Sequence, residues 1–428
     1  MDATRKQTLS RRRRGAPRPV RDDGLRPRIP RMMRVAPSEE SVAQALSRSL
    51  YSGPGMGAFG ALGVVLTAVA CIGPAEDEPE RVAHVEEIGP PALKESINRI
   101  TGLSETRDGR IVLLDAGNGV LIRLGLQGRT FDTLAGPGSG PGELGSNTRG
   151  WMARGPGDST TVTDIGNGRV VVFADDGSGF RSITPTHGIS GGQAWIPVAS
   201  GFISIRNRGA WKGVVHHAAD GRALDTLLTI PWSEPSFGTP SEPLMHIFGE
   251  DLVWAYDGDR QIAISINTKP TVTILDVVSG TTTELDLRIE PTEVTKVDRD
   301  ALVRLWNERA ALSDVPPSMA RRIRVVVPTH FPLIPSLAFA GRDGLLIQGP
   351  PDTSSLSVYD LTEDLLWGTG GRRWLLVDRY GTIDGAIVFA HRFRPLHRLS
   401  DGRLLGVLAD PTHGALPGTA RLPRDLEG

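Results

Sequence analysis

The chain has 428 residues, with 48 Lys and Arg against 49 Asp and Glu, which gives a net charge of −1. Its 51 Gly and 32 Pro exclude a coiled coil or a long helical bundle, because both residues interrupt helices. A hydrophobic content of 39% excludes disorder throughout the chain, and a single cysteine excludes a disulfide framework or a multi-cysteine zinc site.

Residues 1–54 form a basic leader. Residues 1–50 contain 13 Lys and Arg but five Asp and Glu, and show no apolar periodicity, which is typical of a disordered segment. The rest of the charge, −9, falls on residues 72–428. No aromatic residue precedes Tyr51, so we expect no nucleic-acid partner. Met32, Met33 and Met56 are alternative starts, so part of the leader is interpretable as a gene-prediction extension.

Residues 55–71 have the features of an export signal. The uncharged stretch 58–70 reads AFGALGVVLTAVA, which suits the hydrophobic region of a signal peptide and is too short to span a membrane. It ends in Ala68, Val69, Ala70 and Cys71, which resemble a bacterial lipobox. The resemblance implies cleavage before Cys71 and lipid attachment to its thiol. An ordinary secretory signal, giving a soluble secreted protein, is the alternative.

Residues 72–80 are acidic and contain proline, and we interpret them as a tether. Ile72 stands after the cysteine where retention in the inner membrane usually needs Asp. The lipobox resemblance therefore implies a lipoprotein of the outer membrane, or one that faces the periplasm.

A repeat of 49 residues follows the tether. The unit is strand, glycine turn, strand, Gly-containing turn, strand, and Gly128 recurs as Gly177. Asn and Gly tolerate the positive φ of tight hairpins, so each turn is predicted to reverse the chain between two strands. The residues of the two matching turns are Asp115, Gly117, Asn118 and Gly119, and Asp164, Gly166, Asn167 and Gly168.

Short strand patterns separated by Gly-containing turns continue to the C-terminus, including one at 356–359. A period of 40–50 residues built from four short strands is typical of a β-propeller, whereas a β-sandwich would not repeat at a fixed offset. We predict an all-β protein over residues 81–424, a six-bladed β-propeller of four-stranded antiparallel blades. Residues 81–88 alternate suitably to close the ring by pairing with strands at 393–409 and 420–422.

One helical insertion, at about 294–324, interrupts the strands. Val297, Leu302, Leu305, Trp306 and Ala310 have helical spacing and predict an amphipathic helix. A second short helix is predicted after Pro316-Pro317. We expect the insertion to pack against the propeller and cap one face, with a lid as the alternative.

The segment Ala135–Leu144, AGPGSGPGEL, resembles the G-x-G-x-G-P-G-E-F linker between blades of NHL-type six-bladed propellers. The flanking strand units are similar to that family over residues 105–180, and more loosely from 190 to 424. This implies a bacterial exported propeller lipoprotein of the NHL-repeat-like type. The glycine run 136–142 lacks a Lys and precedes no helix, so a linker is favoured over a phosphate-binding loop.

The resemblance also implies an enzymatic alternative, because related propellers include calcium-dependent lactonases and lyases. Asp115, Asn118, Asp164 and Asn167 have ligand chemistry for Ca²⁺ but lie at turns, where capping is the commoner role. We therefore assign no metal or cofactor and no catalytic residue. The adjacent His216 and His217 are expected on opposite faces of a strand. Several tryptophans, Trp254 among them, are expected between blades or along a peptide or glycan groove.

Three functional hypotheses follow. The first is a lipid-anchored binding or scaffold module of the cell envelope, whose loop face holds a protein, peptide or glycan. The second is a hydrolase, lactonase or lyase that uses the central channel with Ca²⁺. The third is a structural component of an envelope complex. The sequence favours the first, because no residue constellation exceeds what turns require.

Overall fold

The computed structural model describes residues 80–125, 128–145, 151–155, 157–186, 188–189, 193–208, 211–231, 238–239, 242–312, 317–341, 344–351, 353, 373–410 and 414–423. The predicted basic leader, lipobox and most of the tether lie outside these residues. The predicted strand at 356–359 also lies outside them.

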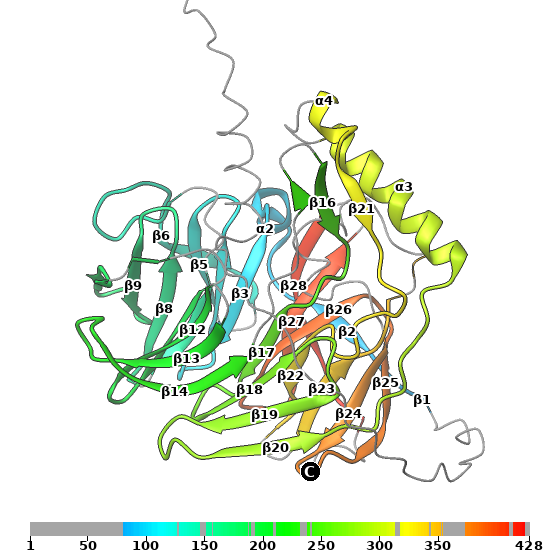
Figure 1. The fold of residues 1–428 in the computed structure, drawn as a ribbon. Coiled ribbons are helices and arrows are strands. Elements are labelled where there is room, and N and C mark those ends of the chain that lie inside the picture. The colour runs from blue at the N-terminus through cyan, green and yellow to red at the C-terminus, as the bar shows by residue number, and fades with distance from the viewer. Residues whose placement is uncertain are drawn as a thin grey trace, which may run out of the picture. The chain divides into compact units, whose positions relative to one another are not determined.

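Six antiparallel sheets succeed one another along the chain, and we call them blades I to VI (Figure 1). Blades I to III are β3 (Ile100–Glu105), β4 (Ile111–Asp115), β5 (Val120–Leu124) and β6 (Phe131–Ala135); β7 (Met152–Gly155), β8 (Ser159–Asp164), β9 (Arg169–Ala174) and β10 (Phe180–Ile183); and β11 (Ala194–Val198), β12 (Gly201–Arg208), β13 (Trp211–His217) and β14 (Ala223–Pro231).

Blades IV to VI follow the same order. They are β17 (Leu252–Tyr256), β18 (Gln261–Ile266), β19 (Thr271–Asp276) and β20 (Thr282–Asp286); β22 (Leu337–Phe339), β23 (Gly344–Gln348), β24 (Arg373–Asp378) and β25 (Ile383–Phe389); and β26 (Phe393–Arg398), β27 (Leu404–Asp410) and β28 (Gly414–Ala420), completed by β2 (Val85–Glu87).

The blades form a ring. The first strand of blade I contacts the first strands of blades II and VI, and first strands also meet between blades II and III, IV and V, and V and VI. Six hydrophobic clusters lie between neighbouring blades, one for each pair. The cluster between blades VI and I also includes Leu93 and Ile97, from and just after the short helix α2 (Pro91–Ser96). The fold is therefore a six-bladed β-propeller, as the sequence predicts.

An N-terminal segment closes the ring. β2 pairs antiparallel with β28 and is the outermost strand of blade VI, which removes a free sheet edge. β1 (Glu80–Ala83) instead pairs parallel with β25 as a fifth strand of blade V. The predicted pairing with the last blade is thus correct for β2 and wrong for β1, because the segment passes from the edge of one blade to the edge of the next.

The predicted last strand at 420–422 is also wrong, because β28 ends at Ala420. The strand GALPGTA contains residues that are rare in sheets, and this conceals the strand pattern in the sequence.

The propeller has two faces. On one, which we call the linker face, lie the connections between blades and the turns between second and third strands. On the other, the turn face, lie the turns between first and second strands and between third and fourth strands. This follows from the antiparallel order of the strands within each blade.

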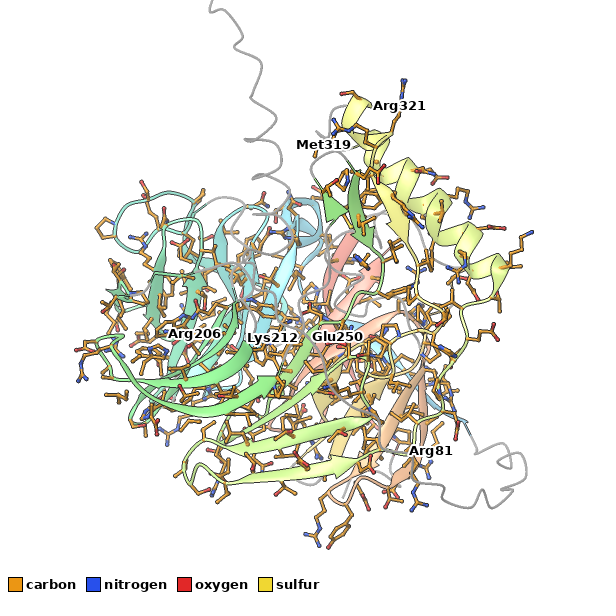
Figure 2. The ribbon with its side chains drawn as sticks, viewed as in Figure 1. Arg81, Arg206, Lys212, Glu250, Met319 and Arg321 are labelled. Carbon is orange, nitrogen blue, oxygen red and sulfur yellow. The ribbon has the colours of Figure 1, made fainter. Side chains whose placement is uncertain are left out.

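An insertion module occupies two connections of the linker face, on either side of blade IV. β15 (Gly238–Thr239) and β16 (Glu242–His246) precede that blade, and α3 (Lys296–Leu312), α4 (Pro317–Ala320) and β21 (Arg324–Val326) follow it. β16 pairs parallel with β21, so the two parts form one sheet. Met319 and Arg321 lie at its tip, at the top of Figure 2.

The insertion module has a hydrophobic core of its own, in which Leu302 and Leu305 of α3 pack with Ile247 and Phe248. Val297, predicted on the apolar face of this helix, is instead 76% exposed. The buried stripe begins only at Leu302, one turn into α3. No helix among the described residues is long and apolar enough to cross a membrane.

Candidate functional site

The turn residues of the repeat hold the linkers between blades. Asp115, at the end of β4, accepts hydrogen bonds from the backbone N–H groups of Asn98 (3.0 Å) and Arg99 (2.8 Å), which immediately precede blade I. It also accepts one from the side chain of Asn118 (2.7 Å), whose Nδ2 also lies 2.7 Å from the Ser96 carbonyl. The left-handed Gly119, with φ 66°, completes the turn.

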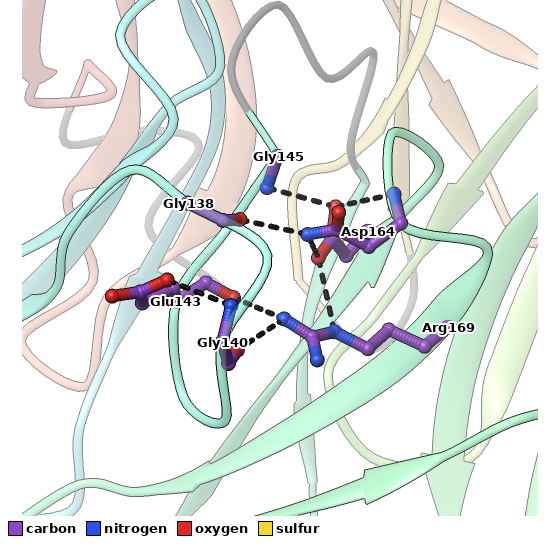
Figure 3. A network of polar contacts seen from close by, with 7 residues as sticks. Gly138, Gly140, Glu143, Gly145, Asp164 and Arg169 are labelled. Atoms are coloured by element: carbon purple, nitrogen blue, oxygen red, sulfur yellow. Dashed lines mark hydrogen bonds and ion pairs between the residues drawn. The ribbon is translucent and has the colours of Figure 1, made fainter.

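Asp164 does the same for blade II (Figure 3). Its carboxylate accepts hydrogen bonds from Gly145 N (3.1 Å), from Asn167 Nδ2 (2.7 Å) and from Arg169 Nε (3.3 Å). The carboxylate is fully buried, and its charge is compensated by the Arg169 guanidinium. Gly168, with φ 65°, corresponds to Gly119.

The glycine-rich segment 136–142 is folded around the side chains of Glu143 and Arg169. Glu143 Oε2 accepts a hydrogen bond from Gly140 N (2.7 Å), and Arg169 Nη2 donates to the carbonyls of Gly140 (2.7 Å) and Glu143 (2.8 Å) (Figure 3). A Cβ on Gly142, at φ +74°, would lie 2.6 Å from the Phe180 ring. The segment is thus a packed linker, in which backbone groups form hydrogen bonds with the side chains of Glu143 and Arg169.

Solvent reaches the first strands of alternate blades. Every residue of β7 in blade II is half-buried, as are Trp254 and Tyr256 of blade IV and the last three residues of β26 in blade VI. The first strands of blades I, III and V are almost entirely buried. Three alternate blades therefore supply most of the half-buried first-strand residues around the axis of the ring, which we call the central channel.

Side chains from these three blades meet across the channel. Trp151, just before β7, has its ring centroid 5.3 Å from that of Trp254 in β17. A Cβ on Gly258, in the β17–β18 turn, would lie 2.8 Å from Cε1 of His397 in β26. The two residues in each contact belong to blades that are not adjacent in the ring, II and IV or IV and VI. The contacts therefore cross the centre of the ring. Trp151 lies toward the linker face, and Gly258 and His397 toward the turn face.

His397 and Arg154 form the polar end of the channel. Burial, and after it the positive charge of Arg154, lower the pKa of His397 to about 4, so its imidazole is neutral at pH 7. A β-bulge between Pro395 and His397 changes the direction in which the histidine points. The Arg154 guanidinium lies 3.9 Å from Asp158, a loose ion pair whose carboxylate is half exposed.

Sequence reasoning missed Trp151, Arg154 and His397 and named only Trp254. A signal was present in β26, whose sequence FRPLHR places proline and three basic side chains on a strand at the centre of the ring. β26 is the inner edge strand of its sheet, where proline is tolerated, and here the proline accompanies the bulge.

Other clusters serve the fold. His216 and His217 contact different serines, as predicted from their places on the strand: His216 Nε2 lies 2.8 Å from Ser200 Oγ, and His217 Nε2 lies 2.7 Å from Ser204 Oγ. The second pair is buried beneath Trp195, so substrate has no access to it. Among the described residues, no three His, Cys, Asp or Glu side chains are placed to hold a metal ion.

Blades III and IV are joined by a buried ion pair, in which Lys212 Nζ donates to Asp251 Oδ1 (2.6 Å). Lys212 is fully buried, and Figure 2 shows it on its strand close to the labelled Glu250. The pair is in the interior and away from the channel wall described above, so we assign it to the packing of the two blades.

Two cavities lie between blades. One of about 510 Å³ is at the closure of the ring, between blades VI and I, and its lining includes Glu105 and Arg129. The Glu105 carboxylate already has two hydrogen-bond donors within the protein, Ser400 N (2.7 Å) and Ser400 Oγ (2.9 Å). The other, of about 190 Å³, is between blades IV and V and is partly lined by Phe339 and Leu345.

No family model matches the sequence, and no curated protein matches it. Among solved structures, virginiamycin B lyase from Staphylococcus aureus is 12% identical, with 76% of this chain and 80% of that chain covered and a TM-score of 0.37. A Bacteroides fragilis protein described as exported is 9% identical over 82% and 98% of the two chains, with a TM-score of 0.44. An oligogalacturonate lyase in complex with manganese is 10% identical over 76% and 78%, with a TM-score of 0.38. Likenesses of this size say nothing of activity.

Proposed function

We propose that the protein is an exported, lipid-anchored β-propeller of the NHL-repeat-like type that binds an anionic ligand with a planar group in its central channel. One observation carries this proposal: three alternate blades place two tryptophans toward one end of the channel and Arg154 with a neutral histidine toward the other. Tryptophan faces bind planar or sugar rings, and a guanidinium binds carboxylate through paired hydrogen bonds. A peptide carboxylate and an acidic glycan both have this chemistry.

Electrostatics favour an anion at this end. Arg154 lies near two carboxylates among the described residues: Asp158, at 3.9 Å and half exposed, and Asp175, on which its positive charge acts against the burial that raises the pKa. The loose pair with Asp158 leaves the guanidinium able to bind a ligand's carboxylate. His397 does not add a second charge at pH 7, because its pKa is about 4. A neutral imidazole supplies one donor and one acceptor, which orients a ligand without repelling a cationic neighbour.

Binding is tested with 2-naphthoate as a planar carboxylate, by quenching of tryptophan fluorescence. We expect Arg154→Ala to weaken binding about tenfold, and Arg154→Lys to restore part of it, because lysine keeps the charge but not the bidentate geometry. Trp254→Ala should also weaken binding, while Trp306→Ala, a half-buried tryptophan of the insertion module, is the matched control. Equal affinity of the Arg154→Ala variant and the native protein would refute the channel site.

The lipid anchor is tested in cells. The lipobox at 68–71 supports attachment of lipid to Cys71, the only cysteine of the chain. We expect the native protein to partition with membranes and Cys71→Ala to become soluble, because each buried methylene of an acyl chain contributes about 0.8 kcal/mol to membrane binding. Unchanged partitioning of the variant would refute the anchor and favour the soluble secreted form.

His397 supports a second candidate, a hydrolase or lyase. A neutral imidazole is the form that can accept a proton from a substrate, and the pKa of about 4 makes His397 a weak base that needs an acidic substrate proton, while Arg154 binds the substrate's carboxylate. Turnover of lactones and unsaturated or acidic sugars by the native protein, lost in His397→Gln while 2-naphthoate binding is retained, would support the enzyme. Lack of turnover of these classes would favour the binding module.

Calcium is tested separately. A Tm that rises with added Ca²⁺ and falls with EDTA would support the calcium-dependent enzyme expected from the resemblance, because a ligand that binds the folded state raises stability. An unchanged Tm would count against it. Asp115 and Asp164 are proposed as structural residues in either case, since their oxygens already accept several N–H donors.

A further inference from the structure

The start of β1 shows where the chain leaves the propeller on its N-terminal side. β1 is parallel to β25, and Glu80 lies beside Ala386. β25 begins at the turn of residues 379–382, on the turn face, and runs toward the linker face. The described chain therefore begins at the outer edge of blade V, at the end of β1 that is nearer the turn face. In Figure 2, Arg81 lies in the lower part of the view, and the tip of the insertion module lies at the top.

Two exposed apolar side chains occupy turns on this side of the molecule. Val278, in the β19–β20 turn of blade IV, is 75% exposed, and Tyr380, in the β24–β25 turn of blade V, is 71% exposed. β20 begins just after the first turn and ends at Asp286, whose carbonyl would lie 3.2 Å from a Cβ on Gly381 in the second turn. The two turns are thus separated by one five-residue strand.

Tyr380 has a cation beside it. The guanidinium carbon of Arg379 lies 4.8 Å from the centroid of the tyrosine ring. Tyrosine is enriched at membrane–water interfaces, where its ring lies at the level of the headgroups, and arginine binds phosphate. We call these three residues, Val278, Arg379 and Tyr380, the rim patch.

The length of the tether brings this patch to the membrane. Eight residues, 72–79, separate Cys71 from Glu80, the first residue of β1, and a fully extended chain of that length spans at most about 30 Å. A lipid on Cys71 would therefore keep the outer edge of blade V, and the turn face beside it, within about that distance of the bilayer.

We propose that the rim patch is the membrane-facing surface of the anchored protein, with Tyr380 and Val278 in the headgroup region and Arg379 near lipid phosphate. The linker face and the insertion module then point away from the bilayer, where they are open to ligands and partner proteins. This inference rests on the proposed lipid anchor. Its test therefore supplies the anchor chemically, so that the two proposals fail separately.

The mature chain, residues 71–428, is coupled through Cys71 to a maleimide phospholipid in phosphatidylglycerol-containing vesicles, and hydrogen exchange is compared with that of the uncoupled mature chain. We expect backbone exchange in residues 277–281 and 379–382 to slow roughly fivefold, because contact with the headgroups suppresses local opening. Exchange in residues 317–322, at the tip of the insertion module, should be unchanged. Protection of residues 317–322 instead of the two turns, or of neither, would overturn the proposal.

Substitutions give an independent readout. In the mature chain, residues 71–428, with Cys71→Ala, Val278→Ser together with Tyr380→Ser should lower partitioning into the same vesicles roughly tenfold, because two apolar contacts with the interface are lost. Val297→Ser is the matched control, since Val297 is equally exposed, at 76%, but belongs to the insertion module. An equal loss of partitioning for Val297→Ser would show that the insertion module contacts the membrane, and would overturn the proposal.

Discussion

The two faces of the propeller use polar side chains in opposite ways. On the linker face, Asp164 is fully buried, and its oxygens accept hydrogen bonds from backbone and side-chain donors around it. On the turn face, Arg154 has a half-exposed carboxylate at 3.9 Å, and the neutral His397 is partly accessible in the channel. A buried group whose hydrogen bonds are complete stabilises the fold, whereas an accessible group with spare capacity is available to a ligand.

This difference shows why the repeat of the sequence is a poor guide to function. The aspartates recur because each blade needs a similar connection between its second-strand turn and the linker that enters it. Asn267 has the corresponding place in blade IV, where its Oδ1 accepts from Asp251 N (2.9 Å) and its Nδ2 donates to the Gly249 carbonyl (3.0 Å). Residues that recur in several blades thus hold blades together, and residues unique to one blade supply the channel.

The largest loss of stability is expected when Asp164, the buried aspartate of the linker face, is replaced. Asp164→Ala removes the side-chain acceptor of Gly145 N and one acceptor each of Asn167 and Arg169 in a buried site, so we expect it to lower the free energy of unfolding by about 3 kcal/mol, measured by urea denaturation. The control is Asp132→Ala, which removes a half-exposed partner of Arg123 and should cost less than about 1 kcal/mol. Similar losses for the two variants would show that the linker-face aspartate is not a structural residue.

A pair of glycine substitutions tests whether His397 packs against the β17–β18 turn. Gly258 and Gly280 both have left-handed φ, +89° and +71°, but a Cβ on Gly258 would meet His397, whereas one on Gly280 would meet nothing within 4 Å. Both alanine variants lose about 1 kcal/mol to backbone strain, and we expect Gly258→Ala to lose about 1–2 kcal/mol more. Equal Tm values for the two variants would mean that His397 is not held against this turn.

The pH dependence of stability reports on His397. Its pKa is about 4 in the folded protein and about 6.5 in an unfolded chain, so between these values the unfolded chain holds a proton that the folded protein lacks. Stability should therefore fall by about 2–3 kcal/mol as the pH is lowered from 6.5 to 4, and His397→Gln should remove this part of the slope. An imidazole signal of His397 that titrates near pH 6.5 by NMR would contradict the expectation.

The sequence was sufficient for the ring but not for the channel. Glycine turns, alternating strands and the closing segment follow from local rules, so the six blades and β2 were predictable from patterns such as DAGNG and TDIGNG. The insertion module was predicted only in its second part, because β15 has only two residues and the sequence of β16, EPLMH, contains a proline and no β-branched residue. The parallel pairing of β1 depends on which blade edge lies nearest, which no local pattern encodes.

The channel site escaped prediction because it unites residues that are far apart in the chain. Trp151 and Trp254 belong to blades that the sequence separates by about 100 residues, and Arg154 and His397 by more than 200. Each looks like an ordinary strand residue by itself. The three alternate blades come together only because the chain closes into a ring of a particular radius. The number of repeats in the sequence does not specify which first-strand residues remain accessible in that ring.

Of these substitutions, the smallest effect on the free energy of unfolding is expected at Asp158, a half-exposed aspartate on the turn face. Asp158 has φ 55°, which asparagine tolerates as well as aspartate, and its carboxylate is half exposed and 3.9 Å from Arg154. Asp158→Asn should therefore change the free energy of unfolding by less than about 0.5 kcal/mol. Because it removes the counter-charge of Arg154, we expect it to tighten 2-naphthoate binding about two- to threefold, an effect that 0.5 M salt should reduce. Weaker binding by this variant would show that Asp158 positions the arginine, and that the anion site is built by the pair.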